Sequence, residues 1–447
     1  MIEDNTDLPR DLGDGLILRW ATVDDVEALA EFNLRIHTDD PNEPELFLKH
    51  WTRELMQGQH PTTNANDFTV VVDENEGGKI VSSMNLISQR WAYDGVDFGV
   101  GRPELVGTDE NYRRRGLVRA QFEAIHAISA ARGELVQAIT GIPWYYRQFG
   151  YEMGVDLGGS RNYYLLPSRL KKSQEKTDEP FKIRPAEVTD IQVLRELYAR
   201  FCADSLLSRV RDETLWQWEL FQSNRDTPYA RQVHMITSAD DPAIIGYIEY
   251  NRWRTTCYLR EIAVQPGHSL RAVALFALRY LERLAGEGNE QDNIPLERIS
   301  LELGSDHPVY EALVWELEKQ NLPYGWFLRV LDVPAFLQHI KSVLERRLAE
   351  SVMAGHTGKT RLNFYRSFWE LVWENGRLSH ITPYQPKSFQ DGDAYFPELT
   401  FLQLLFGHRS LKELRHSFVD CRVRNGDTAV LLNILFPKRP SWVIPLG

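Results

Sequence analysis

The stretch that decides the fold runs from Glu104 to Glu152 and reads ELVGTDENYRRRGLVRAQFEAIHAISAARGELVQAITGIPWYYRQFGYE. It opens with a strand-like run, ELVGTD, which leads into a turn of three arginines followed by Gly116. From Leu117 to Ala131 apolar residues recur at helical spacing, and a second strand-like run and an aromatic segment follow. This order predicts a strand, a tight turn, a helix and a second strand within an α/β domain.

The arginine turn has the residue types of an anion site. Arg113 to Val118 satisfies most of an R/Q-x-x-G-x-G/A pattern, with Val118 in the last small-residue position. Unpaired N–H groups and the positive dipole end at a helix start attract anions, and Gly116 lets the backbone approach a phosphate closely. A solvated surface is the alternative for an isolated arginine triplet. The flanking strands and the FGY ending favour the anion site.

The chain contains an internal repeat on either side of a charged linker, Pro167 to Pro180. LILRWATVDDVEALAEF begins at Leu16 and FKIRPAEVTDIQVLREL begins at Phe181. A shift of 165 residues superposes Arg19 on Arg184, Ala21 on Ala186, Val23 on Val188, Asp25 on Asp190 and Leu29 on Leu194. A hairpin signal, a strand, a helix and a further strand then follow in the same order in both halves, which predicts two copies of one domain.

A third region without a motif of its own begins near Val333 with helical text, VPAFLQHIKSVLERRLAE, and continues with strand-like and helical runs. It predicts an α+β domain. The expected domains are therefore residues 1–166, 180–332 and 333–447.

Composition narrows the classes of function. The chain has 447 residues and a net charge of −12, which argues against a nucleic-acid binder and favours a cationic small molecule or basic peptide as partner. Three scattered cysteines indicate neither a disulfide framework nor a thiolate zinc site, and the histidine spacing predicts no metal. The polar start and the lack of a long apolar run predict no signal peptide and no membrane span. A cytoplasmic location is the expectation.

RRRGLVRA at Arg113–Ala120 and YYRQFGYE at Tyr145–Glu152 resemble the GNAT superfamily of acetyltransferases. More narrowly, the chain resembles the enhanced-intracellular-survival (Eis) family of tandem-domain acetyltransferases. The weak second copy and a terminal block similar to a sterol-carrier-protein fold, with ELTFLQLLFG and LLNILFP, carry this narrower resemblance. It implies an α/β (α+β) fold: a catalytic GNAT domain in 1–166, a degenerate GNAT-like domain in 180–332 and a sterol-carrier-protein-like domain in 333–447.

The resemblance implies acetyl-CoA as co-substrate, without a metal, held where the strands Glu104–Asp109 and Leu135–Thr140 splay. The pantetheine arm would pair with the backbone of one strand and the pyrophosphate would sit on the helix start. The cofactor-binding residues so implied are Val106, Gly107, Thr108, Arg113, Arg114, Arg115, Gly116, Leu117, Val118 and Arg119. In the second copy Leu270–Leu275 takes the place of the motif, with one arginine and no glycine, so this copy is expected to bind no acetyl-CoA.

The same resemblance implies catalytic roles for Tyr146 and for the terminal carboxylate of Gly447. A phenol can protonate a departing thiolate, although core packing is the alternative for a tyrosine among aromatics. The Gly447 carboxylate would act as general base, and a frayed glycine tail is its alternative. The sequence departs from the family at Gly141–Pro143, where a Ser-Glu pair is common, which places one cofactor contact in doubt.

The function expected is transfer of an acetyl group from acetyl-CoA to a primary amine, on a small molecule or a lysine side chain, by direct attack. The alternatives are a non-catalytic acyl-CoA-binding sensor or scaffold and, from the terminal domain alone, a lipid carrier. Acidic residues after the first helix could attract an ammonium group or form a solvated loop: Asp39, Asp40, Glu43 and Glu45. The resembling family often assembles, so a homo-oligomer is an expectation, with neither a nucleic-acid nor a membrane partner.

Overall fold

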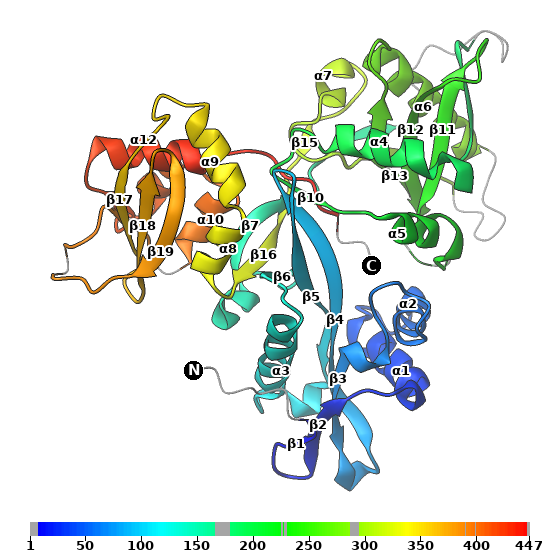
Figure 1. Ribbon diagram of the computed structural model, residues 1–447. Coiled ribbons are helices and arrows are strands. Elements are labelled where there is room, and N and C mark those ends of the chain that lie inside the picture. The colour runs from blue at the N-terminus through cyan, green and yellow to red at the C-terminus, as the bar shows by residue number, and fades with distance from the viewer. Residues whose placement is uncertain are drawn as a thin grey trace.

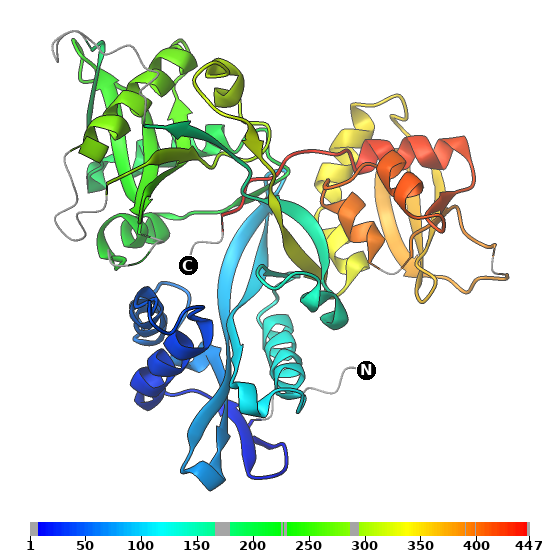
Figure 2. The same cartoon turned by 180° about the vertical axis from the view of Figure 1, so that it is seen from behind.

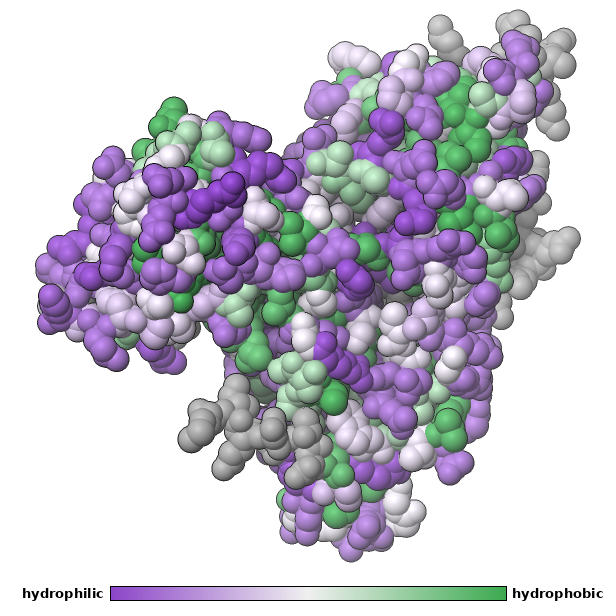
Figure 3. Space-filling model, in the orientation of Figure 1, coloured by the Kyte–Doolittle hydropathy of each residue, from purple (hydrophilic) through white to green (hydrophobic). Residues whose placement is uncertain are grey.

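The protein has three lobes, each built around its own β-sheet (Figure 1). The computed structural model describes residues 8–165, 179–224, 227, 230–286, 295–388, 390–397 and 399–444. The same three lobes are seen from behind in Figure 2, with the first copy in blue and cyan, the second in green and the terminal region in yellow to red. On the face shown in Figure 3 the surface is mostly hydrophilic, with apolar patches scattered over the lobes.

The first lobe is a nine-stranded sheet in the order β1-β2-β3-β4-β5-β6-β16-β7, with β10 paired to β4. All neighbours are antiparallel except β5 and β6. Its strands are β1 (Arg10–Asp11), β2 (Leu16–Trp20), β3 (Phe68–Asp73), β4 (Lys79–Tyr93), β5 (Val96–Thr108), β6 (Val136–Ile139), β16 (Tyr324–Val330), β7 (Glu152–Leu157) and β10 (Leu207–Arg209).

Helices cover both faces of this sheet because side chains of β4 alternate between them. Met84 and Leu86 pack with α3 (Leu117–Ala131) on one face. Ile87 packs with α1 (Val26–His37) and α2 (Phe47–Met56) on the other. A sheet buried on both sides is what the long apolar strands of this copy require.

The second lobe is a seven-stranded sheet in the order β15-β8-β14-β13-β12-β11-β9. Its strands are β15 (Gln320–Asn321), β8 (Ser160–Tyr164), β14 (Arg298–Leu301), β13 (Thr256–Val264), β12 (Ile244–Trp253), β11 (Gln232–Ser238) and β9 (Phe181–Pro185). Its helices are α4 (Ile191–Phe201), α5 (Glu213–Gln217), the π-helix η7 (Trp218–Gln222), α6 (Leu270–Gly286) and α7 (Val309–Ala312).

The residues that superpose in the sequence repeat make the same contacts in both copies. Arg19 holds the Asp25 carboxylate through two nitrogens at 2.8 Å each, and Arg184 holds Asp190 at 2.6 and 2.9 Å. Each aspartate also accepts the backbone N–H at the start of its short 3₁₀ helix, from Thr22 and Glu187, at 2.8 Å in both copies. The tandem α/β fold is thus confirmed.

The two copies exchange strands. β8 follows β7 of the first lobe in the chain, yet it pairs with β14 of the second sheet. Conversely, β16 comes from the second copy and lies between β6 and β7 of the first sheet. Each sheet is therefore completed by the other half of the chain, and the sequence boundaries proposed for the domains stay a prediction.

The third lobe has a five-stranded sheet in the order β19-β18-β17-β20-β21. Its strands are β17 (Gly358–Asn363), β18 (Phe368–Glu374), β19 (Arg377–Pro383), β20 (Ala394–Tyr395) and β21 (Arg422–Val423), and its helices are α8 (Val333–His339), α9 (Lys341–Ala349), α10 (Thr400–Leu405), α11 (Leu411–Ser417) and α12 (Gly426–Leu435). The segment from Val333 that the sequence predicts as one helix forms two helices, because the chain turns at Ile340, whose side chain is buried.

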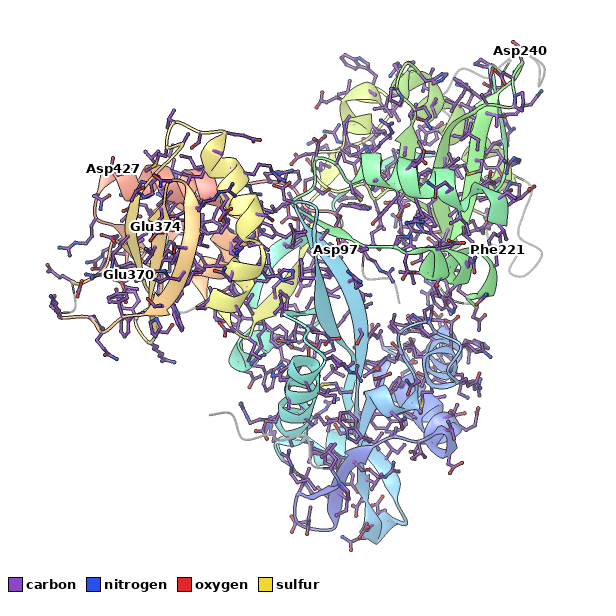
Figure 4. The ribbon with its side chains drawn as sticks, viewed as in Figure 1. Asp97, Phe221, Asp240, Glu370, Glu374 and Asp427 are labelled. Atoms are coloured by element: carbon purple, nitrogen blue, oxygen red, sulfur yellow. The ribbon has the colours of Figure 1, made fainter. Side chains whose placement is uncertain are left out.

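The hairpin between β4 and β5 joins the three lobes. Asp94 at its tip pairs with Arg346 and Arg347 of the third lobe at 2.9 Å each and with Arg439 at 2.8 Å. The Asp97 carbonyl, near the centre of the molecule in Figure 4, accepts a hydrogen bond from His339 at 2.7 Å. The tip of the first sheet is therefore anchored by cations from the terminal region.

Among the described residues, no helix combines the length and the apolar character that a membrane span needs. In the same part of the chain, no cluster of three or more His, Cys, Asp or Glu side chains is arranged to hold a metal ion.

We expect the exchanged strand β16 to contribute strongly to the free energy of unfolding. Trp326 of β16 is fully buried, lies 5.5 Å from Trp91 between ring centroids, and donates its indole N–H to the Val443 carbonyl at 3.0 Å. We expect Trp326→Ala to lower the free energy of unfolding by about 3–5 kcal/mol. The matched control is Trp315→Ala, since this indole is 84% exposed and its loss should cost less than about 0.5 kcal/mol. Denaturant titration measures both, and equal losses would contradict the role given to β16.

Candidate functional site

The parallel strands β5 and β6 part soon after they meet. Their register includes only Val100 opposite Val136 and Gly101 opposite Gln137, whereas β5 continues to Thr108 and β6 to Ile139. Beyond Gly101 the side of β5 that faces β6 has no strand partner in the described chain. We call residues 102–108 of β5 and 138–139 of β6, which do not pair with each other, the β5–β6 fork.

A β-bulge lies inside the fork. Asn85 is opposite Glu104 and Ser83 is opposite Gly107, so Leu105 and Val106 together face Met84. Leu105 has a positive φ of 49°, a backbone conformation that costs a non-glycine residue about 1–3 kcal/mol. Bulges re-aim the strand that contains them.

Three neighbours hold the bulge in place. The Leu105 carbonyl accepts a hydrogen bond from Ser83 Oγ at 3.4 Å, and the His37 ring bonds to the same backbone. Ser83 also donates to Asn33 of α1 at 3.1 Å. Burial lowers the pKa of His37, so its imidazole is neutral near pH 7.

The arginine turn presents open backbone donors. Arg114 and Gly116 have left-handed φ values of 64° and 79°, and Gly116 is the N-cap of α3 with no side chain capping it. Nothing lies within 4 Å of where a Gly116 Cβ would sit. The first N–H groups of a helix have no partner within the helix, so they face open space beside the exposed arginines Arg113 and Arg115.

A buried polar network fixes this helix start to the end of β5. Ser82 Oγ donates to the Gly107 carbonyl at 2.8 Å, lies 2.8 Å from the Thr108 hydroxyl, and accepts from Gln121 of α3 at 2.7 Å. Gln121 in turn accepts from Thr69 at 3.1 Å. The residues expected to contact pantetheine and those expected to contact the pyrophosphate therefore share one rigid frame.

Tyr146 lies in a short 3₁₀ helix, η5 (Tyr145–Phe149), after β6. Its ring is 3% exposed and packs edge-on against Phe122 of α3 and Phe327 of the exchanged strand, at centroid distances of 6.2 and 6.1 Å. The hydroxyl makes no hydrogen bond within the described residues, and it is not among the polar atoms sealed from solvent. The ring of Tyr146 is thus buried in the core, while its hydroxyl remains available to a ligand.

Electrostatics keep that hydroxyl protonated. Burial raises the pKa of Tyr146 well above its ordinary value, and the nearby Glu104 carboxylate raises it further. A phenol with a raised pKa stays neutral at pH 7 and can donate a proton to a stronger base formed beside it.

The segment where the sequence departs from the resembling family lies against Tyr146. A Cβ on Gly141 would lie 3.7 Å from the Tyr146 hydroxyl oxygen, and Gly141 has a φ of 121° that favours glycine. Its carbonyl accepts a hydrogen bond from Tyr324 of the second copy at 2.9 Å. Ile142 and Trp144 that follow are exposed, so this side of the fork is formed by backbone and apolar groups.

In the second copy, the backbone groups that correspond to the fork and the helix start are hydrogen-bonded within the chain. The Ser269 hydroxyl accepts the N–H of Ala272 at 3.2 Å at the start of α6, and Arg271 pairs with Glu316 at 2.6 Å. The Tyr310 hydroxyl accepts the N–H of Leu303 at 3.0 Å and donates to the Leu301 carbonyl at 2.7 Å. The backbone beyond β14 is thus already satisfied by the chain itself.

Some of the residues singled out in the sequence lie elsewhere. Asp39, Asp40 and Glu43 are exposed between α1 and α2, and Glu45 is half-buried there. Gly447 lies outside the described residues. Sequence reasoning missed Ser82, Gln121, His37, Asn85 and Glu104. Of these residues, only Glu104 could have been recognised from the sequence, because it is a charged residue inside a predicted strand next to the motif.

Comparison with known proteins identifies the first copy. Residues 27–154 match the family model of the acetyltransferase (GNAT) domain. This segment is a GNAT acetyltransferase domain. No curated protein shows significant sequence similarity to the chain.

Solved structures resemble this chain over nearly its whole length. A probable N-acyltransferase from Enterococcus faecalis superposes with a TM-score of 0.66 at 13% identity, covering 95% of this chain and 97% of the other. A GCN5-related N-acetyltransferase from Kribbella flavida gives 0.63 at 18%, with 95% and 97% covered. Eis1 from Mycobacterium abscessus gives 0.56 at 14%, with 95% and 98% covered. At these identities the likeness establishes the fold, and the expected Eis-like arrangement is confirmed at that level.

The network behind the fork gives a stability prediction. Ser82→Ala leaves the buried amide of Gln121 without an acceptor, so we expect a loss of about 1–3 kcal/mol in the free energy of unfolding. Ser379→Ala, on the exposed face of β19, is the control and should change it by less than about 0.5 kcal/mol. Thermal and urea unfolding would report both, and an unchanged midpoint for Ser82→Ala would disprove the network.

Proposed function

We propose that the chain transfers an acetyl group from acetyl-CoA to a primary amine of a small molecule or a lysine side chain. The GNAT domain in residues 27–154 supports acyl transfer in general. The observation that carries the finer proposal is the uncapped start of α3, placed at the mouth of the β5–β6 fork with Gly116 at its N-cap.

The fork has the chemistry that coenzyme A requires. Its diphosphate needs several N–H donors and positive charge, which the backbone of residues 114–119 and the side chains of Arg113, Arg114 and Arg115 would provide. Its pantetheine arm carries amides, which would pair with the open edge of β5 at Val106, Gly107 and Thr108. Leu117, Val118 and Arg119 form the first turn of α3.

Arg119 connects the phosphate side to the catalytic side. Its guanidinium lies 5.2 Å from the ring centroid of Phe149 and donates to Gln148 at 3.3 Å, and both residues lie in the same 3₁₀ helix as Tyr146. Binding of an anion at the start of α3 would therefore occur at a fixed distance from the Tyr146 hydroxyl. Such fixed positioning supplies much of the acceleration in a two-substrate reaction.

In the proposed reaction the amine nitrogen attacks the thioester carbonyl, a C–N bond forms, and the C–S bond breaks. Tyr146 donates its proton to the departing sulfur, since its hydroxyl is open and its raised pKa keeps it protonated at neutral pH. For the base, the family resemblance implies the carboxylate of Gly447. A chain extended by one alanine after Gly447 tests that role, because the extension moves the carboxylate.

The acceptor is proposed only as an amine. The exposed acidic residues Asp39, Asp40 and Glu43 near the start of α2 would attract an ammonium group. A panel of aminoglycosides, polyamines and lysine peptides, assayed by release of free thiol from acetyl-CoA, would select among the classes.

The phosphate site predicts a difference between the two copies. Arg114→Gln keeps a polar side chain and removes its charge, so we expect the dissociation constant of coenzyme A to rise about 10-fold or more. Arg271→Gln removes the matching charge of the second copy, already paired with Glu316, and should leave the dissociation constant unchanged. Titration calorimetry with coenzyme A measures both, and equal effects would refute the assignment of the site to the first copy.

Tyr146 predicts a loss of turnover without a loss of binding. We expect Tyr146→Phe to lower kcat by about 10²–10⁴-fold, because the proton donor to sulfur is gone. The dissociation constant of coenzyme A should not change. Tyr145→Phe is the matched control, since it removes the hydroxyl of the neighbouring tyrosine in the same helix. Thiol release with the best amine is the assay, and full activity of Tyr146→Phe would exclude its role as general acid.

A further inference from the structure

The segment that leads from β6 into η5 follows a strained path. We call residues 140–144 the β6–η5 connection. Gly141 and Trp144 in this connection have positive φ values of 121° and 66°, and such a value is strained for a residue with a side chain. Strained backbone persists where surrounding contacts hold it in place. The path of the connection, which sets the position of Tyr146, therefore depends on contacts with other elements.

The exchanged strand β16 supplies such a contact from the second copy. Its Tyr324 hydroxyl donates to the Gly141 carbonyl at 2.9 Å. A Cβ on Gly141 would lie 3.7 Å from the Tyr146 hydroxyl oxygen, so this bond is made beside that hydroxyl. On the same strand, Phe327 packs against the Tyr146 ring, and its own ring lies 6.4 Å from that of Tyr324 between centroids. One strand thus contacts both the ring of Tyr146 and the backbone next to its hydroxyl.

A second contact holds the other end of the connection. The Arg147 guanidinium lies over the exposed Trp144 ring, at 4.4 Å from its centroid. The same guanidinium pairs with the buried carboxylate of Glu152 on β7 at 3.1 Å. The β6–η5 connection is therefore held at Trp144 from within the first copy and at Gly141 from the second.

The corresponding tyrosine of the second copy uses its hydroxyl differently. The stretches ELVQAITGIPWYY and RISLELGSDHPVY of the internal repeat place Tyr310 opposite Tyr146. The Tyr310 hydroxyl accepts from the Leu303 N–H at 3.0 Å and donates to the Leu301 carbonyl at 2.7 Å. Its proton is therefore committed to the backbone at the end of β14. The Tyr146 hydroxyl makes no hydrogen bond within the described residues.

From this contrast we infer that Tyr324 is a positioning residue for Tyr146. Its hydroxyl satisfies the Gly141 carbonyl just after β6 and so leaves the proton of Tyr146 free for the departing sulfur. The inference rests on the proposed acetyl transfer and adds to it a residue from the second copy. It concerns the segment in which this sequence departs from the resembling family, so the resemblance does not supply it.

Removal of the Tyr324 hydroxyl should weaken proton donation and leave coenzyme binding intact. In Tyr324→Phe the Gly141 carbonyl loses its donor while the Tyr146 hydroxyl lies beside it. The Tyr146 phenol is then drawn to this carbonyl, as Tyr310 is to Leu301, and its proton is less available when the C–S bond breaks. The arginine turn is untouched, because the network around Ser82 fixes it to β5.

The test measures thiol release in a single turnover, with enzyme in excess over acetyl-CoA and the best amine of the panel at saturation. This rate reports the transfer step separately from product release. We expect Tyr324→Phe to slow it about tenfold and to leave the dissociation constant of coenzyme A unchanged. Tyr164→Phe is the matched control and should match wild type, since this tyrosine lies on the other exchanged strand, β8, and is 42% exposed.

A double-mutant comparison separates the positioning of Tyr146 from general support of the fold. In the Tyr146→Phe background, the addition of Tyr324→Phe should change the single-turnover rate by less than about twofold, because the group that Tyr324 positions is already gone. A merely structural role of Tyr324 would slow both backgrounds by the same factor.

A single-turnover rate of Tyr324→Phe within about twofold of wild type overturns the positioning role and leaves the proposed function standing. Equal slowing by Tyr324→Phe in the two backgrounds has the same consequence. A wild type that releases no thiol with any amine contradicts the proposed function and this inference together.

Discussion

The pairing of β5 with β6 covers two register positions and then stops, and the site depends on that limit. A continuous parallel pair would satisfy its own backbone groups and leave no edge for a ligand. The chain prevents closure with an extra residue at Leu105, held in a left-handed conformation by buried partners from α1 and β4. The strain of that residue and the unpaired polar atoms beside it are the local cost of keeping the strands apart.

The two copies show the same architecture in an open and a closed form. In the first, Gly116 leaves the helix start uncapped and Glu104 reaches the fork. In the second, Ser269 caps the helix, and three arginines and three glutamates form a buried network that includes Glu261. The second copy still contributes to the first, because its strand β16 places Phe327 against Tyr146.

Sequence reasoning succeeded where a feature is encoded locally. The turn at Gly116 and the repeated positions of Arg19 and Asp25 involve residues a few positions apart, so the sequence indicates the turn and the repeat. The ion pair that Arg19 forms with Asp25 was seen only in the structure. The exchange of β8 and β16 could not be predicted, because strand partners far apart in the chain leave no local signal. The bulge at Leu105 was missed for a similar reason, since a leucine in an apolar strand gives no sign of a positive φ.

Amide hydrogen exchange of the full chain, with and without coenzyme A, tests whether the fork binds this coenzyme. If the fork binds this coenzyme, exchange should slow at residues 105–119, where the backbone of β5 and the start of α3 gain partners. The corresponding stretch of the second copy, residues 261–275, should exchange at the same rate in both conditions. Protection confined to the second copy, or no protection at Leu117–Arg119 at saturating coenzyme A, would show that the fork does not bind the coenzyme.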